Sequence, residues 1–387
     1  MPILNRAAEM QEEIAAWRRH LHSIPELNFG THKTSDFVTG KLKEFGCDEV
    51  VTGLGRTGVV GLIRGRHGDG RTVGLRADMD ALPITEKTGK PYASSVPGVM
   101  HACGHDGHTA MLLGAAKYLA ETRNFSGAVA VIFQPAEEGG GGGHEMVKDG
   151  MMERFAIERV FGMHNMPGLP IGQFATRPGA IMAATAEFTI TVTGKGGHAA
   201  MPHRTIDSIV IGSQLVGALQ TIASRSTDPV DSVVVSVTKF HGGDAYNVIP
   251  ERVQLAGTVR TLRKEVAASA EQRLRSIAAG IAAAFGADIH VDYDANYPVT
   301  LNHPDETVFA SDVAADVAGD PNVHRAVQPV MGGEDFSYML QARPGAFMFM
   351  GNGDTAGLHH PAYDFNDDAI PHGMSYWIRL AETALAA

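Results

Sequence analysis

Short, nearly continuous apolar runs alternate with helical stretches along this chain, and that alternation limits the possible folds. Four such runs can be recognised: Thr72–Ala77, Gly127–Phe133, Arg159–His164 and Gly345–Gly351. A run without polar alternation is typical of a strand that is covered on both faces. The pattern therefore predicts an α/β domain, which begins with a helix from about Ala8 to His20.

The stretch from Ala183 to about Pro298 has a different pattern, because apolar and polar residues alternate along its predicted strands. Its elements follow the order βαββαβ, which is the order of a ferredoxin-like sandwich. Alternating strands predict a sheet with one face on helices and one face open. We expect residues 183–298 to form such a domain, inserted into a larger domain made of residues 1–182 and 299–387.

Size and charge exclude several classes of partner. The 387 residues exceed the usual size of a single core, which favours two domains. A net charge of -11 argues against nucleic acid or an anionic membrane as a partner. The chain has only 2 cysteines and shows no signal peptide or stretch long enough to span a membrane. These features predict a cytoplasmic protein.

Side chains of the kinds that bind metals follow the apolar runs. A single histidine or cysteine is usually a core residue, but here such residues recur at predicted strand ends, where α/β sheets bind ligands. Thiolate, imidazole and carboxylate donors together suit zinc, manganese, nickel or cobalt better than calcium or magnesium. The residues concerned are Asp78, Asp80, Cys103, His105, Glu137, Glu138, His164, His359 and His360.

Two spacings within this set indicate how the side chains act. Cys103 and His105 are two residues apart, so in an extended segment both point to one side and can reach one ion. Glu137 and Glu138 are adjacent, so in an extended segment they point in opposite directions. One of the two glutamates can then bind metal while the other acts as a general base on water.

Three polar residues are candidates in the inserted domain. His198 and Asn247 lie in glycine-rich turns, and Arg260 lies on the strand that follows Asn247. The planar fork of an arginine can bond both oxygens of a carboxylate. Arg260 is therefore suited to binding a carboxylate, although each of the three residues alone is more often an ordinary surface residue.

Taken together, the motifs resemble the M20 metallopeptidase family, in particular its amidohydrolases, which include hippurate hydrolase and other N-acyl-amino-acid deacylases. The similarity extends from "RRHLHSIPELNF" near the start to "LHHPAYDF" near the end. The other motifs that carry it are "RADMDALPI", "MHACGHDGHTAML", "FQPAEEGGGG", "GMHN", "GGHAAMPH", "NVIP" and "GGEDFSYM". Cysteine at position 103, where other M20 branches have aspartate, favours the amidohydrolases.

The resemblance implies a two-metal catalytic domain with a central mixed sheet, interrupted by a lid that also forms a homodimer. It implies Glu137 as the general base and Asp80 as a residue that orients a histidine ligand. The lid residues that bind substrate would be His198, Asn247 and Arg260, with His198 acting in the partner subunit. Two divalent ions (Mn, Zn, Ni or Co) would be held by Cys103, His105, Glu138, His164 and His359, with His360 in the variable position of the "LHHP" motif.

The function implied is hydrolysis of the amide bond of N-acyl amino acids. One alternative is a dipeptidase or carboxypeptidase of the same family, which trials of N-acyl amino acids against dipeptides would separate. Another is a catalytically inactive binding protein on the same scaffold. Such a protein is expected to lack the base or a ligand, whereas this sequence keeps Glu137 and every ligand position.

Overall fold

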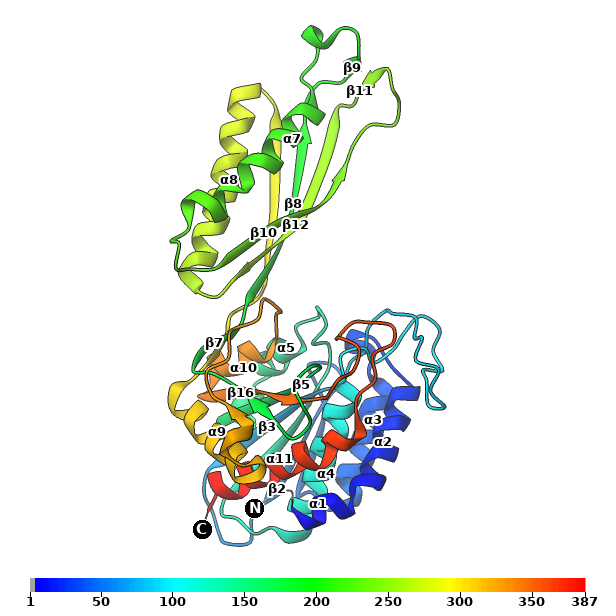
Figure 1. The fold of residues 1–387 in the computed structure, drawn as a ribbon, viewed down its shortest axis with the longest axis vertical. Helices are drawn as coiled ribbons and strands as arrows, with labels where there is room; N and C mark the ends of the chain where they lie inside the picture. The colour runs from blue at the N-terminus through cyan, green and yellow to red at the C-terminus, as the bar shows by residue number, and fades with distance from the viewer. Residues whose placement is uncertain (1–3, 387) are drawn as a thin grey trace. The chain divides into compact units, whose positions relative to one another are not determined.

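The computed structural model describes residues 4–386, which divide into two compact units (Figure 1). Unit 1 consists of the chain up to Ile181, Thr300–Gln328, and the chain from Asp335 onward. Unit 2 consists of Met182–Val299 and Pro329–Glu334. The short segment 329–334 belongs to unit 2 because Val330 bridges Met182 and the Gly332 carbonyl accepts a hydrogen bond from the Ala183 amide.

Unit 1 is built on an eight-stranded mixed sheet, which confirms the predicted α/β class. Its inner strands β4, β3, β5 and β16 are mutually parallel, so their carboxyl ends meet at one edge. They are almost entirely buried, as their apolar runs predict. In spatial order the strands are β1 (Glu49–Leu54), β2 (Gly58–Arg64), β4 (Ala128–Gln134), β3 (Thr72–Asp78), β5 (Ile157–Met166), β16 (Gly345–Gly351), β6 (Phe174–Ala175) and β15 (Val323–His324). A separate pair joins β7 (Gly179–Met182) to β14 (Thr300–Asn302).

Helices cover this sheet, and α4 (His105–Thr122) is the most buried of them. It packs on β3 and lies against α2 (Gln11–Ser23) and α11 (Ile370–Ala384). The predicted first helix is interrupted at Met10, which separates α1 (Asn5–Glu9) from α2, so the prediction of one continuous helix is wrong. The remaining α-helices of unit 1 are α3 (His32–Glu44), α5 (Gly142–Lys148), α6 (Met151–Arg154), α9 (Pro304–Ala318) and α10 (Phe336–Ala342).

Unit 2 has a four-stranded antiparallel sheet and two long helices. Its elements follow in the order β8 (Ala184–Thr193), α7 (Ser208–Leu219), β10 (Val233–His241), β12 (Arg252–Thr261), α8 (Lys264–Phe285) and β13 (Asp288–Tyr297). The strands lie side by side as β10-β12-β8-β13. Both helices share an apolar core with one face of the sheet, and exposed polar residues such as Asp288 and Asp292 alternate along β13.

A two-stranded ribbon completes unit 2 and lies at one end of it (Figure 1). Its strands are β9 (Gly197–His198) and β11 (Val248–Ile249), and Val248 is paired with His198. No helix within residues 4–386 is both long and apolar enough to cross a lipid bilayer.

Candidate metal centre

The structure brings the five predicted metal ligands together at the carboxyl edge of the unit 1 sheet. The Sγ atom of Cys103 lies 3.4 Å from Nε2 of His164, the histidine on β5. Oε1 of Glu138 lies 3.4 Å from Nε2 of His359 and 3.9 Å from Nε2 of His105. Possible donor atoms of Cys103, Glu138 and His359 all lie within 4.8 Å of one another, a spacing that suits a shared cation.

Two of these histidines are oriented in the same way by the backbone. Nδ1 of His105 lies 2.8 Å from the Asp80 carbonyl oxygen, and Nδ1 of His164 lies 2.7 Å from the Asn165 carbonyl oxygen. Because a carbonyl only accepts, each Nδ1 carries a proton, and Nε2 is left as the ring nitrogen that can bind a cation. Metal-binding histidines are usually held in this way.

Nε2 of His105 and Oε1 of Glu138 are buried and make no hydrogen bond within the described chain. Leaving such atoms unpaired costs free energy, and a cation between them would remove that cost.

The two glutamates lie in a turn that Asp80 fixes. The Asp80 carboxylate accepts hydrogen bonds from the Glu137 amide at 2.9 Å and from the Glu138 amide at 3.1 Å. Asp80 therefore orients the glutamate turn through its side chain and His105 through its carbonyl. The carboxylates of Glu137 and Glu138 both lie within 4.8 Å of a nitrogen of His105.

The extended backbone predicted from Cys103 to His105 and at Glu137 and Glu138 is wrong. Gly104 has φ of 91°, and His105 is already the first residue of α4. Ala136 has φ of 55°, and a turn follows that directs both glutamates toward the centre. The side chains still converge, because left-handed residues redirect the chain at these two points.

His359, not His360, is the histidine of the "LHHP" motif that reaches the cluster. His359 has a left-handed backbone with φ of 63°, and its amide donates to the Ala102 carbonyl at 2.8 Å. His360 is exposed, and its Nδ1 accepts a hydrogen bond from the Ala362 amide at 3.1 Å.

The electrostatics of the cluster favour a positive charge. Burial, together with the carboxylates of Glu138, Glu137 and Asp78, raises the pKa of the Cys103 thiol well above its usual value. Burial alone would lower the pKa of His105, but Asp78, Asp80 and Glu138 outweigh it and raise that pKa to about 10. A cation would offset these negative charges and stabilise the thiolate. The donor set therefore fits divalent metal ions.

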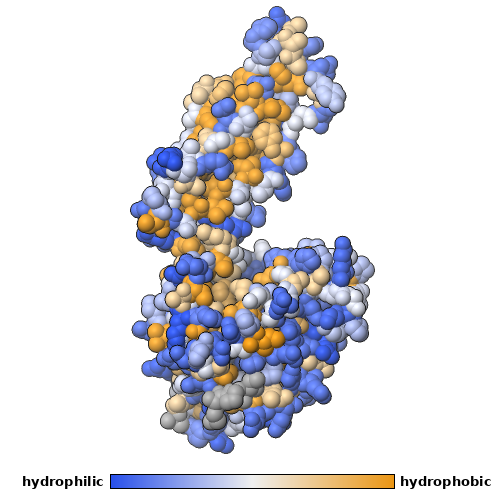
Figure 2. Space-filling model, in the orientation of Figure 1, coloured by the Kyte–Doolittle hydropathy of each residue, from blue (hydrophilic) through white to orange (hydrophobic). Residues whose placement is uncertain are grey.

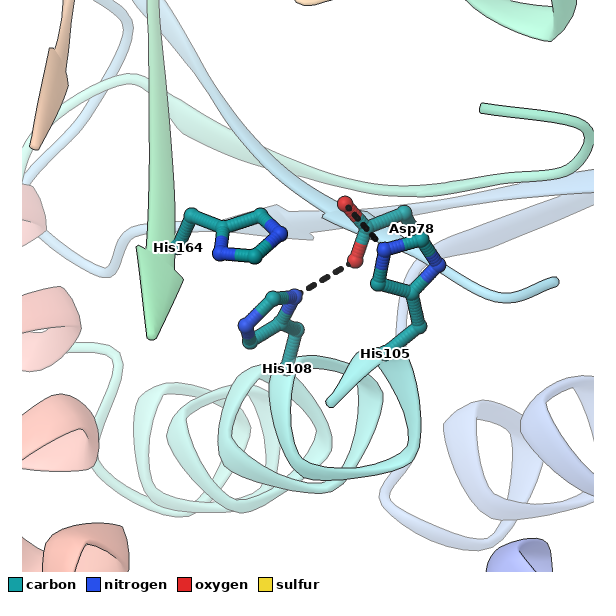
Figure 3. Close-up of side chains that lie close together, drawn as sticks. All are labelled: Asp78, His105, His108 and His164. Carbon is teal, nitrogen blue, oxygen red and sulfur yellow. Dashed lines mark hydrogen bonds and ion pairs between the residues drawn. The ribbon is translucent and has the colours of Figure 1, made fainter. Parts of the chain in front are cut away.

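His108, which was not predicted as a site residue, and Asp78, to which no role was assigned, complete this region (Figure 3). His108 donates from Nδ1 to Oδ1 of Asp78 at 2.6 Å, and its Nε2 accepts from the Asn165 amide at 3.0 Å. Because both of its nitrogens are used, His108 has no lone pair left for a metal. Asp78 is likewise held by His108 and by Arg76, whose NH1 lies 2.8 Å from Oδ2.

Asn165 links this pair to the thiol segment. Its side-chain amide donates to the Cys103 carbonyl at 2.6 Å, and its Oδ1 accepts from the Tyr363 hydroxyl at 2.7 Å. His108, Asn165 and Tyr363 lie in the motifs "HACGHDGH", "GMHN" and "LHHPAYDF", but none of the three was assigned a role from the sequence.

The candidates in unit 2 fall into two places. His198 and Asn247 are neighbours on the exposed ribbon, where the Ala199 amide donates to the Asn247 carbonyl. Arg260 lies near the other end of β12, eight residues beyond Arg252, which puts it about 26 Å along the strand. The structure therefore does not bring Arg260 together with His198 and Asn247 within one chain.

The comparison with protein families is decisive, because residues 74–383 match Peptidase family M20/M25/M40. The chain belongs to this family. It is 42% identical to the hippurate hydrolase of Campylobacter jejuni over 98% of this chain and 99% of that one. It is also 42% identical to thermostable carboxypeptidase 1 of Saccharolobus solfataricus, over 90% of this chain and 88% of that one.

Among solved structures, the chain is similar to the Bacillus subtilis YXEP protein, a dinuclear metal binding peptidase of the M20 family. The TM-score is 0.84 at 36% identity, and the match covers 98% of this chain and 99% of that chain. These similarities agree with a divalent metal centre at the sheet edge.

Proposed function

We propose that this protein is a metal-dependent amidohydrolase that cleaves the amide bond of N-acyl amino acids such as hippurate. The observation that carries the proposal is the pair of histidines, His105 and His164, whose Nε2 atoms face a thiol and a carboxylate beside Glu137. The similarity to a hippurate hydrolase over nearly the full length of both chains supports the same chemistry.

Two divalent ions per subunit would be held by Cys103, His105, Glu138, His164 and His359. The mixed donors suit manganese, zinc, nickel or cobalt. When bound, such ions polarise the amide carbonyl and make water acidic enough to ionise near neutral pH.

Glu137 would act as the general base. It lies next to the ligands in the turn held by Asp80, and it is buried, with 7% of its surface exposed. Its carboxylate would take a proton from water as the water oxygen bonds to the acyl carbon. It would then pass the proton to the nitrogen as the carbon–nitrogen bond breaks, releasing a carboxylic acid and an amino acid.

Unit 2 would be a ferredoxin-like lid that also forms a homodimer. Nδ1 of His198 accepts from the Ala200 amide at 3.1 Å, so its proton is on Nε2, which can donate to an oxyanion. Apolar side chains gather on unit 2 (Figure 2). Its exposed large apolar residues include Met201, Val210, Val234, Phe240, Tyr246 and Val248, a set that favours a protein interface.

A dimer would also explain how Arg260 and the ribbon could act on the same substrate although they lie far apart within unit 2. Arg260 and the ribbon of one chain are too far apart to hold the same small substrate. Arg260 from one subunit and His198 with Asn247 from the other could together bind the substrate carboxylate and the oxyanion.

The test is to strip the enzyme with a chelator, add back single divalent ions, and assay hippurate, N-acetyl amino acids and dipeptides. We expect hydrolysis of N-acyl amino acids only after metal is restored. Preference for peptides would favour the carboxypeptidase alternative, to which the similarity to thermostable carboxypeptidase 1 points. Full activity in metal-free protein, checked by elemental analysis, would exclude both.

A further inference from the structure

The N-terminal motif "RRHLHSIPEL" supplies none of the residues assigned to the metal centre, yet it contains a fully buried arginine. The side chain of Arg18, on α2, has 0% of its surface exposed. A buried guanidinium is costly unless it is paired with carboxylates. The carboxylates that pair with Arg18 therefore indicate the role of its buried charge.

The carboxylates that pair with Arg18 come from two segments that are far apart in the sequence. Its NH1 atom lies 3.1 Å from Oδ1 of Asp364 and 3.5 Å from Oδ2 of Asp106, and its Nε donates to Oδ1 of Asp367 at 2.8 Å. Its guanidinium carbon lies 4.5 Å from the ring centre of Tyr92. The Tyr92 hydroxyl donates to the other oxygen of Asp364 at 2.7 Å, so Asp364 is held from two sides.

Both segments carry predicted metal ligands. Asp106 follows His105 in the first turn of α4, and Asp364 lies in the same loop as His359. The left-handed backbone of His359 is unfavourable for a residue other than glycine, so the loop needs contacts that hold it in place. One of these is the hydrogen bond from the Lys87 amide to the Pro361 carbonyl at 2.7 Å.

We propose that Arg18 is a positioning residue of the metal centre. Its guanidinium ties the start of α4 to the loop after β16, and this fixes the separation of His105 and His359. Metal affinity depends on that separation, because ligands held in place lose little freedom on binding. The inference rests on the proposed function, since it takes both histidines as ligands.

The main variant is Arg18→Lys, which keeps the charge but cannot bond several carboxylates in one plane. Its matched control is Arg19→Lys on the same helix. Arg19 is half-exposed and contacts Asp367 and the Tyr92 ring, but within residues 4–386 it makes no ion pair with Asp106 or Asp364. Both variants are compared with the parent protein after metal removal.

The readout is the affinity for Co²⁺, measured from its visible absorption in competition with a chelator. We expect Arg18→Lys to bind roughly 10-fold or more weakly, as is usual when a residue supporting a ligand is lost. Arg19→Lys should bind within about twofold of the parent. Circular dichroism and the melting temperature of each metal-free variant show whether it is folded.

Tyr92→Phe provides a milder second variant, because it keeps the ring beneath Arg18 and removes only the bond to Asp364. We expect it also to weaken Co²⁺ binding, and its effect should not add fully to that of Arg18→Lys, since both side chains bond to Asp364. If Arg18→Lys does not fold, the Co²⁺ affinity of Tyr92→Phe becomes the test of the proposal. Unchanged affinity in the folded variants would overturn the role of Arg18, whereas a parent protein that binds no Co²⁺ would overturn the proposed function instead.

Discussion

At the residue scale, adjacent glutamates have different surroundings despite their shared turn. Burial would raise the pKa of Glu138, but His359, whose Nε2 lies 3.4 Å from Oε1 of Glu138, and His105 outweigh it and lower that pKa. An anionic carboxylate facing imidazole nitrogens is suited to binding a cation. Glu137 lies beside this cluster, and its proposed role is to exchange a proton with water.

Replacing each glutamate in turn tests this division of roles. Glu137→Gln should retain metal and lose turnover by roughly 100-fold or more, because the amide cannot take a proton. Glu138→Gln should lose metal affinity as well as activity. Elemental analysis and steady-state kinetics of the two variants measure both quantities. Equal loss of metal from the two would mean that the roles are assigned wrongly.

His22 makes the stability of unit 1 depend on pH. Burial opposes its charged form, but the Asp106 carboxylate, 2.8 Å from Nδ1, outweighs this and raises the pKa of His22 to about 9. The folded pKa exceeds the unfolded value of about 6.5. The stabilisation is therefore complete below pH 6.5 and is lost as the pH rises through 9.

His22→Gln should accordingly lower the melting temperature by several degrees at pH 6, and the difference from the parent should shrink toward pH 10. The control is His20→Gln, since His20 is an exposed residue on the same helix. Thermal unfolding of the three metal-free proteins across this pH range provides the measurement. If the difference in melting temperature between His22→Gln and the parent stays constant with pH, the stabilisation does not come from the charged form of His22.

At the element scale, the turn into α4 depends on a single glycine. A Cβ atom at Gly104 would overlap the Asn165 side-chain amide and the Tyr363 hydroxyl, and the residue has φ of 91°. Gly46 has a similar φ of 78°, but a Cβ atom there would meet open space. Alanine variants at the two glycines therefore separate the cost of a left-handed backbone, which both share, from the cost of steric overlap, which arises only at Gly104.

Gly46→Ala should cost about 1–2 kcal/mol of unfolding free energy, from its left-handed backbone alone. Gly104→Ala should cost more and should also weaken metal binding, because it displaces the segment that carries Cys103. Chemical denaturation and metal competition on both variants test this. Similar losses of stability, with metal affinity unchanged, would show that the contact with Asn165 does not position the thiol.

The strands of unit 1 were predictable because burial on both faces leaves a continuous apolar run, and β16 has the bounds that its sequence predicts. The turns at Gly104 and Ala136 could not be predicted in this way, because the groups around such turns, for example Asn165 and Tyr363 beside Gly104, come from segments distant in sequence. The same limit applies to His105 and His108. They lie in one motif, and only their partners on other elements show that one keeps a free nitrogen and the other does not.

At the scale of the whole molecule, the separation of Arg260 from the ribbon predicts a site shared between two chains. His198→Ala and Glu137→Gln would each inactivate the enzyme through a different part of the site. If the parts come from different subunits, mixing and re-annealing the variants creates heterodimers with one intact site, and activity returns. If His198 serves its own subunit, the mixture stays inactive. Sedimentation of the active enzyme as a monomer would also reject the shared site.

The parallel pairing of β16 with β5 has a consequence for the newly made chain. Strand β5 is complete before unit 2 begins, but its neighbour β16 emerges only after unit 2 has been synthesised. At ordinary elongation rates this delay is on the order of ten seconds. During this delay we expect β5 to present an apolar, unpaired edge of the kind that recruits other chains. Ribosome-bound chains that end before Gly345 should therefore be the species that needs a chaperone most.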